Sequence, residues 1–135
     1  MFVNDTTATS PEGVMAALSR FGKGGNIILL AGGSSKGLEY EALGAQIGEE
    51  CKYVVLFEGS GTDDIAKSIG EGAPYEKVDS MKKAVKIAAS HAKLGDVILL
   101  SPGTASFGMF KNEFERADQF KLGFEAFKRK SKKKK

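Results

Sequence analysis

The sequence predicts an α/β protein with a Rossmann-like, mostly parallel sheet that is covered by helices on both faces. Five short apolar runs alternate with five segments of helical character, and the connections between them are short. The apolar runs are nearly continuous rather than alternating, which is typical of strands buried on both faces of a sheet. Since strands joined through helices form right-handed parallel crossovers, this order favours one parallel sheet.

The strands are predicted where aliphatic and aromatic residues cluster between turn-forming residues. The clearest run reads Asp-Val-Ile-Leu-Leu from Asp96 to Leu100 and lies between Gly95 and Pro102. The five predicted strands comprise residues 1–3, 26–31, 53–57, 75–78 and 96–100.

The helices are predicted from start signals and apolar spacing. Ser10, Pro11 and Glu12 combine a hydroxyl N-cap, proline at the first helical position and an acid in the first turn. Asp79 and Ser80 cap a later helix. The predicted helices begin near residues 10, 40, 62, 79 and 107, the last with phenylalanines at 107, 110 and 114.

Two positions in the middle helices lead to specific expectations. Thr62 is expected to be an N-cap, since two aspartates follow it in the first turn. Gly44 is unfavourable inside the helix predicted over residues 40–48, because glycine has a low helix propensity.

Length and composition indicate one domain over residues 1–127, followed by a disordered lysine-rich tail over residues 128–135. The chain has 135 residues, and 41% of them are hydrophobic, which suits a single core. A single cysteine excludes an internal disulfide, and no Cys/His spacing indicates zinc. Without a membrane-spanning apolar run or a signal peptide, the expected location is the cytoplasm.

The net charge of +3 comes from the tail. Residues 128–135 contain seven Lys and Arg, which leaves 13 Lys and Arg against 17 Asp and Glu and a net charge of −4 for the rest. A block of like charge is either a solvated end or a nonspecific contact for nucleic acid or another anionic surface. No aromatic residue is interleaved in it, which argues against specific base recognition.

Three loops follow predicted strands and carry small polar residues: residues 4–9, 32–37 and 101–107. In a parallel sheet, these loops open at the same edge, where ligands of α/β proteins bind. Together they offer a carboxylate, hydroxyls, backbone N–H groups and Lys36, which suits an anionic ligand. The alternative is that they are ordinary turns, in which Gly, Ser, Asn and Asp are common.

Other features are interpreted as structural. Residues 32–37 lack the Gly-x-x-x-x-Gly-Lys-Ser/Thr spacing of a phosphate-binding loop. The phenylalanines after residue 107 are interpreted as packing residues rather than stacking platforms for bases. Cys51 has no adjacent base, and His91 lies late in its helix, so neither indicates a nucleophile.

The same three loops carry a resemblance to a known family. Residues 4–9, Asn-Asp-Thr-Thr-Ala-Thr, resemble the Asn-Asp-Ser-Lys-Ala-Thr-Asn segment of the Mur ligases. Residues 29–36 are similar to their Leu-Gly-Gly-x-x-Lys loop, and residues 101–112 to their Ser-Pro-x-x-x-Ser-Phe-Asp-x-Phe-x-Asn signature. The resemblance covers about residues 2 to 127, corresponds to the C-terminal domain of the family, and is greatest to the members that add D-glutamate.

The resemblance implies a share of two binding sites. Asp5, with Asn4 beside it, would contact the ribose and adenine of ATP. The amino-acid site would hold D-glutamate by its carboxylates through Thr9, Lys36, Ser106 and the backbone at Phe107. Thr7 stands where the family usually has lysine, and Gly108 where it usually has Asp.

The family joins an amino acid to a UDP-muramoyl precursor of peptidoglycan at the cost of ATP. Its ATP-phosphate loop, Mg²⁺ site and UDP pocket lie in central and N-terminal domains that the resemblance does not place in these residues. We therefore expect ATP and Mg²⁺ to act through a central domain, in cis or in trans, and the isolated chain to be inactive. The alternatives are a standalone module for an acidic amino acid or nucleotide, and an inert fragment with a polyanion-binding tail.

Overall fold

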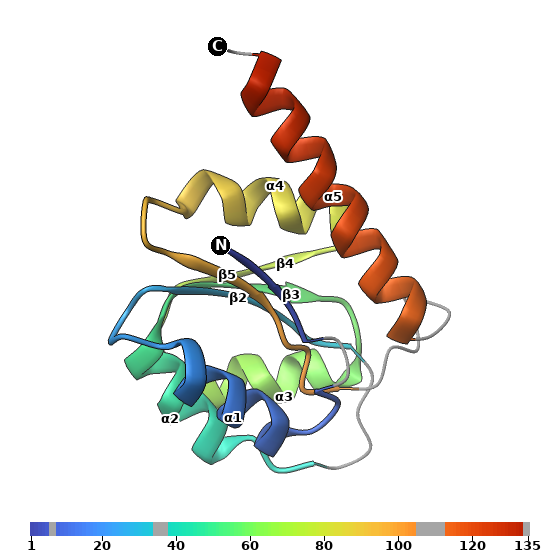
Figure 1. Ribbon diagram of the computed structural model, residues 1–135. Helices are drawn as coiled ribbons and strands as arrows, with labels where there is room; N and C mark the ends of the chain where they lie inside the picture. Colours follow the sequence, from blue (N-terminus) through green and yellow to red (C-terminus); the bar gives the residue numbers. More distant parts are fainter. Residues whose placement is uncertain (6–7, 34–37, 105–112, 134–135) are drawn as a thin grey trace.

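A computed structural model describes residues 1–5, 8–33, 38–104 and 113–133 of the chain. Within these residues, five strands and five helices alternate (Figure 1). The strands are β1 (Phe2–Asn4), β2 (Ile27–Ala31), β3 (Cys51–Phe57), β4 (Tyr75–Val78) and β5 (Val97–Leu100). The helices are α1 (Pro11–Phe21), α2 (Glu41–Glu50), α3 (Ser60–Ile69), α4 (Met81–His91) and α5 (Glu113–Lys133).

All strands pair in parallel in one sheet with the order β1-β5-β2-β3-β4. Helices α1, α2 and α3 cover one face, whereas α4 and α5 cover the other (Figure 1). The predicted fold class is confirmed.

The position of the helices follows from the handedness of the crossovers. The steps from β1 to β2, β3 and β4 all run in one direction across the sheet. Right-handed crossovers therefore place α1, α2 and α3 on the same face. The step from β4 to β5 runs backwards, so that α4 crosses β3 and β2 on the opposite face.

Each face of the sheet has its own core because side chains alternate along a strand. Ile27, Leu29 and Ala31 face α1, α2 and α3, whereas Ile28 and Leu30 face α4 and α5. All four residues of β5 are buried, which explains why this strand is a continuous apolar run.

The predicted helix starts at Ser10 and Ser80 are confirmed. The Ser10 hydroxyl accepts a hydrogen bond from the Gly13 N–H at 3.3 Å, and the Ser80 hydroxyl accepts one from the Lys83 N–H at 3.2 Å. The prediction for Thr62 is wrong, since α3 begins at Ser60 with Gly59 as its N-cap. The Thr62 hydroxyl instead donates to the Phe57 carbonyl oxygen at the end of β3.

Helix α5 continues to Lys133, past residue 127 and into the lysine-rich segment for which the sequence predicted disorder. Lysine and arginine have high helix propensities, which accounts for the continuation. The C-terminal end of α5 projects beyond α4 (Figure 1). The domain boundary at residue 127 stays a prediction.

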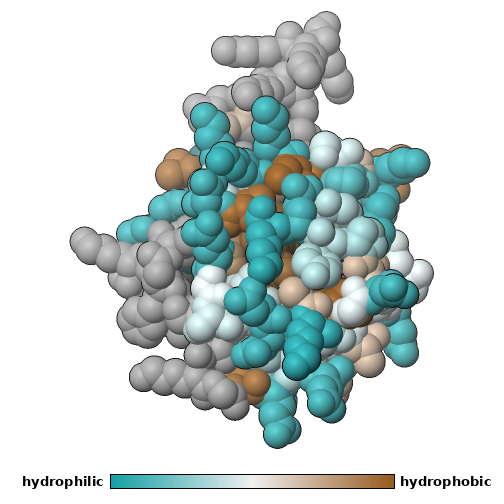
Figure 2. Space-filling view, turned by 180° about the vertical axis from the view of Figure 1, so that it is seen from behind, coloured by the Kyte–Doolittle hydropathy of each residue, from teal (hydrophilic) through white to brown (hydrophobic). Residues whose placement is uncertain are grey.

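The described surface is largely hydrophilic on the face seen in Figure 2, with a smaller apolar area between the charged residues. In the described part of the chain, no helix combines the length and the apolar character that crossing a membrane requires.

Two glycines of α2 provide a test of this packing. A Cβ atom at Gly44 would lie 2.2 Å from the Ser68 carbonyl oxygen of α3, whereas one at Gly48 would meet its nearest neighbour, the Gly72 Cα, at 3.4 Å. We expect Gly44→Ala to lower the free energy of unfolding by about 1–3 kcal/mol, because α2 and α3 must separate. Gly48→Ala should be neutral or raise it by up to about 1 kcal/mol through helix propensity. Urea denaturation measures both, and equal effects would contradict the close contact of α2 with α3.

Candidate functional site at the carboxyl ends of the strands

The first junction of the site joins the ends of β1 and β5. The Asp5 N–H donates to the Leu100 carbonyl oxygen at 2.7 Å, which continues the pairing of these strands by one residue. The buried Ser101 hydroxyl donates to Asp5 Oδ2 at 2.9 Å. The other carboxylate oxygen, Oδ1, has no hydrogen-bond partner among the described residues. The Asp5 carboxylate is thus held at one oxygen and open at the other.

The loops after β2 and β5 are joined to each other and to the loop after β1. The Gly32 N–H donates to the Pro102 carbonyl oxygen at 3.0 Å, and the Gly103 N–H donates to the Ala8 carbonyl oxygen at 2.8 Å. The Tyr40 hydroxyl donates to the Gly103 carbonyl oxygen at 3.0 Å from a buried position. The three loops that the sequence singled out therefore meet at one edge.

Thr62 fixes the loop after β2 from its other side. Its hydroxyl accepts a hydrogen bond from the Gly33 N–H at 3.1 Å while it donates to Phe57. Gly32 has a φ of 103°, a left-handed conformation that favours glycine. A Cβ atom at Gly32 would lie 2.5 Å from the Thr62 hydroxyl oxygen, so this close approach also requires glycine.

After Gly103, the loop that follows β5 is held at Thr104 by a buried arginine. Arg116 of α5 is fully buried, and its Nη1 donates to the Thr104 carbonyl oxygen at 3.4 Å. The Thr104 hydroxyl is buried without a hydrogen-bond partner in the described part of the chain. The loop after β5 is therefore fixed from α5 as well as from the sheet.

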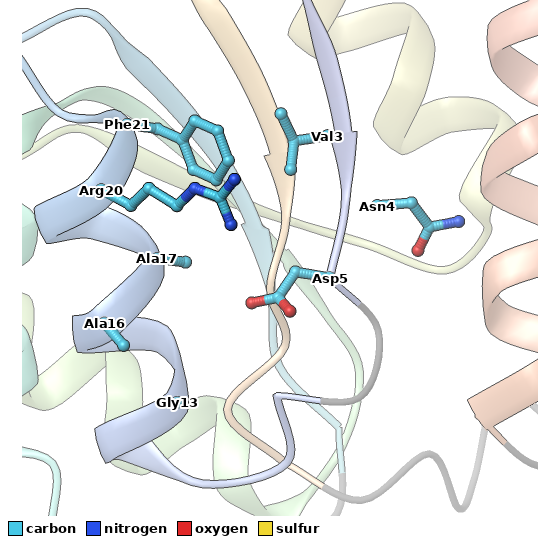
Figure 3. Close-up of a pocket in the computed structure, with 8 residues that line it drawn as sticks. All are labelled: Val3, Asn4, Asp5, Gly13, Ala16, Ala17, Arg20 and Phe21. Carbon is cyan, nitrogen blue, oxygen red and sulfur yellow. The ribbon is translucent and has the colours of Figure 1, made fainter.

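A cleft of about 300 Å³ opens between the end of β1 and α1. Figure 3 shows the Asp5 carboxylate and the Arg20 guanidinium directed into it from opposite walls. Gly13, Ala16 and Ala17 lie on the same α1 wall as Arg20 and leave space because their side chains are small. The cleft therefore combines an acceptor and a cation.

The structure separates the two residues predicted to contact ATP. Asn4 is directed away from α1 (Figure 3), and its Nδ2 donates to the Ala117 carbonyl oxygen of α5 at 3.3 Å. Asp5 faces the cleft, since consecutive side chains of an extended strand point to opposite sides.

Of the four residues predicted to hold D-glutamate, Thr9 alone belongs to the described part of the chain. It is exposed and follows Ala8, whose carbonyl oxygen is bonded to Gly103. Lys36, Ser106 and Phe107 lie outside the described residues. Their segments begin directly after Gly33 and Thr104, which are both held at the same edge.

The sequence interpretation missed Tyr40, which holds this edge, and Arg20, which lines the cleft beside β1. Arg20 carries a signal in its spacing, because it lies seven residues after Gly13 and hence on the same face of α1. Tyr40 carries no comparable signal, since its partner is 63 residues away in the chain.

Cys51 and His91 lie away from this edge and have structural roles. Burial raises the pKa of the Cys51 thiol to about 12, so this side chain is protonated and unreactive near neutral pH. His91 stacks on Tyr53 with their ring centroids 3.8 Å apart. Among residues 1–5, 8–33, 38–104 and 113–133, no three His, Cys, Asp or Glu side chains gather into a group that could hold a metal ion.

Comparison with known proteins agrees with this fold. The family described as "Mur ligase, glutamate ligase domain" matches residues 1–104. A UDP-N-acetylmuramoylalanine--D-glutamate ligase from Roseiflexus sp. (strain RS-1) is 44% identical over 131 residues, which cover 93% of this chain and 28% of the relative. A protein of the same name from Acetivibrio thermocellus is 41% identical over 129 residues, which cover 89% of this chain and 27% of the relative.

A solved structure has a similar fold. It is a domain assigned to a UDP-N-acetylmuramate:L-alanyl-gamma-D-glutamyl-medo-diaminopimelate ligase from Haemophilus ducreyi 35000HP. The TM-score is 0.56 at 14% sequence identity, and the match covers 90% of this chain and 89% of that domain. By contrast, the chain spans only 27–28% of the length of the two ligases above.

Two buried threonines test how the edge is held. We expect Thr62→Val to lower the free energy of unfolding by about 1–3 kcal/mol, because the Gly33 N–H and the Phe57 carbonyl lose their partner. Thr104→Val is the matched control: it removes a hydroxyl without a partner and should change stability by less than about 1 kcal/mol, towards higher stability. Thermal and urea unfolding of both variants measure the difference. A loss at Thr104 as large as that at Thr62 would contradict this account.

Proposed function

This chain belongs to the Mur ligase family and carries its glutamate ligase domain, as the sequence resemblance indicated, and on this premise we propose that it works as part of a D-glutamate-adding ligase. Its share would be to hold D-glutamate and one side of ATP. The whole reaction would join D-glutamate to UDP-N-acetylmuramoyl-L-alanine, a precursor of peptidoglycan.

The observation that carries the proposal is the junction of Asp5 with Ser101. Strands β1 and β5 are neighbours, but the chain leaves β1 towards α1 and leaves β5 towards α5 on the opposite face. Such a reversal opens a crevice at the carboxyl ends of the strands, which is where α/β folds bind ligands. Asp5 stands in this crevice with Oδ1 open, as an acceptor for the hydroxyls of a ribose.

We assign the nucleotide contact mainly to Asp5. Asn4 would contribute from the other side of β1, where its amide is bonded to α5. The ATP phosphates and Mg²⁺ would be held by the central domain of the ligase. ATP supplies the phosphoryl group that activates the acceptor carboxylate, and this domain contributes positioning, the main requirement of such a transfer.

The amino-acid site is proposed for Thr9, Lys36, Ser106 and the Phe107 backbone. A dicarboxylic amino acid requires a cation and several N–H or O–H donors, and these residues supply them. Support comes from the three loops that carry them, because hydrogen bonds between the described parts of these loops bring them to one edge. A site of this kind would select the D isomer by the placement of donors around two carboxylates.

The test of the amino-acid site is an NMR titration of the 135-residue chain with D-glutamate, with L-glutamate as the control ligand. We expect shifts that favour the D isomer and concentrate on Thr9, Lys36, Ser106 and Phe107. Lys36→Gln should weaken binding about tenfold, because a charge-assisted hydrogen bond is lost. Lys86→Gln, which removes an exposed charge from α4, is the matched control.

Equal shifts with both isomers, or none at millimolar D-glutamate, would contradict a site held by this chain. So would an equal loss of affinity in the Lys36 and Lys86 variants.

A second prediction concerns catalysis. Residues 1–135 contain no Gly-x-x-x-x-Gly-Lys-Ser/Thr segment that could hold the ATP phosphates. We therefore expect these residues by themselves to release no phosphate from ATP in the presence of Mg²⁺ and D-glutamate. A phosphate-release assay measures this, with the ligase from Acetivibrio thermocellus as the positive control. Release that depends on both Mg²⁺ and D-glutamate would contradict the division of roles.

A further inference from the structure

We propose that the domain has a contact surface for an anionic lipid membrane at the amino ends of its strands. This amino-end surface consists of Lys23, Lys93, Leu94 and residues 128–133 of α5. Leu94 would enter the membrane interface, and the cations would lie against the phosphates of the lipids. Since all strands run parallel, the surface lies at the opposite end of the sheet from Asp5 and is independent of the proposed ligand site.

The turn between α4 and β5 presents Leu94 to the solvent, where this side chain is fully exposed. The Asp96 N–H donates to the Lys93 carbonyl oxygen at 3.0 Å, and the Lys93 N–H donates to Asp96 Oδ2 at 2.8 Å. The same carboxylate forms an ion pair with Lys52 at 2.8 Å. The turn is therefore held at its base while its apolar tip stays outside the core.

Helix α5 leads its lysine-rich end to the same side of the sheet, because it runs antiparallel to β1. The Ala117 carbonyl oxygen accepts from Asn4 near the carboxyl end of β1, whereas the Phe124 ring centroid lies 4.2 Å from that of Phe2 near its start. The later residues of α5 therefore leave the sheet at its amino end, where the helix projects beyond α4 (Figure 1). Residues 128–133 bring five Lys and Arg to this end and no acidic residue.

Lys23 adds a further cation from the loop between α1 and β2. Its N–H donates to Asn26 Oδ1 at 2.7 Å, and the Asn26 carbonyl oxygen accepts from the Val97 N–H at 2.9 Å, at the start of β5. The loop of Lys23 and the turn of Lys93 are therefore neighbours, and both lysines are exposed. The amino-end surface thus combines an exposed leucine with cations from three separate segments.

The apolar residue decides between two kinds of anionic partner. Lys and Arg clusters bind the phosphates of nucleic acids and are also attracted to anionic lipid headgroups. A sugar-phosphate backbone gives no apolar contact to an exposed leucine, whereas the membrane interface binds apolar side chains that lie beside lysines. Stacking on bases would require aromatic side chains, and residues 128–135 contain none. The surface therefore fits anionic lipids better than nucleic acid.

The charge of the other layer would orient the domain on such a membrane. Helices α1, α2 and α3 contain six acidic and two basic residues. A negative surface potential repels this layer and attracts the amino-end surface. The domain would then bind with the carboxyl ends of its strands directed away from the lipid, so that the edge with Asp5 stays open to ligands.

The experiment is flotation of the 135-residue chain with phosphatidylcholine vesicles that contain or lack phosphatidylglycerol. We expect binding only where phosphatidylglycerol is present, and weaker binding as the salt concentration rises. Deletion of residues 128–135 should remove most of the binding. Lys23→Gln combined with Lys93→Gln should weaken it at least about tenfold, since each lysine near an anionic surface contributes about fivefold. Lys67→Gln combined with Lys82→Gln, at exposed positions of α3 and α4, is the matched control and should leave binding nearly unchanged.

Leu94→Gln tests the lipid contact itself. We expect it to weaken vesicle binding about threefold to tenfold, because the apolar side chain no longer enters the interface. Leu38→Gln is the matched control at a leucine that is 40% exposed before α2, and it should have no effect. The same variants are titrated with single-stranded RNA, against which neither leucine substitution should change the affinity.

Three results would overturn the proposal: equal binding to vesicles with and without phosphatidylglycerol, equal losses in the two lysine pairs, or vesicle binding that Leu94→Gln leaves intact. Binding to RNA but not to vesicles would also overturn it and would assign the cations to nucleic acid. D-glutamate binding is measured separately on the same variants, so that the membrane contact and the proposed amino-acid site can each fail without the other.

Discussion

The handedness of the chain crossovers is the constraint on which the rest of this structure depends. Because each crossover is right-handed, the direction of a step across the sheet decides which face the next helix covers. The single backward step, from β4 to β5, inserts β5 between β1 and β2 and sends α4 to the other face. Without this step, β1 and β2 would be neighbours, and no reversal would lie beside Asp5.

Hydrogen bonds join the loops that follow β1, β2 and β5 at the edge where this reversal lies. Ser101 holds one oxygen of Asp5, Pro102 accepts from Gly32, and Gly103 donates to Ala8. Tyr40, the N-cap residue of α2, and Arg116 of α5 hold the same loop. The described part of this loop is therefore held from several sides, and preorganisation of this kind would suit the proposed amino-acid site. The small cleft lies beside this edge, between β1 and the side of α1 that runs from Gly13 to Phe21.

Much of this could be predicted from the sequence, because local signals decided it. Buried strands appear as apolar runs in the sequence. Ser10 and Ser80 mark helix starts because each hydroxyl accepts a hydrogen bond from the backbone N–H three residues later. The order of the strands and the role of Thr62 could not be predicted, since they depend on contacts between distant segments. Gly44 shows the same limit: it is unfavourable by propensity, yet required by the approach of Ser68. The proposed site residues came from the family motifs, whereas the position of Arg20 in a cleft depends on the fold.

A crystal structure of this chain grown with ADP and D-glutamate would show whether ligands bind at the carboxyl ends of β1, β5 and β2. We expect the ribose within hydrogen-bond distance of Asp5 and the amino acid beside the loops that follow β2 and β5. Ligand density at the amino ends of the strands, or on the α4 face of the sheet, would contradict it.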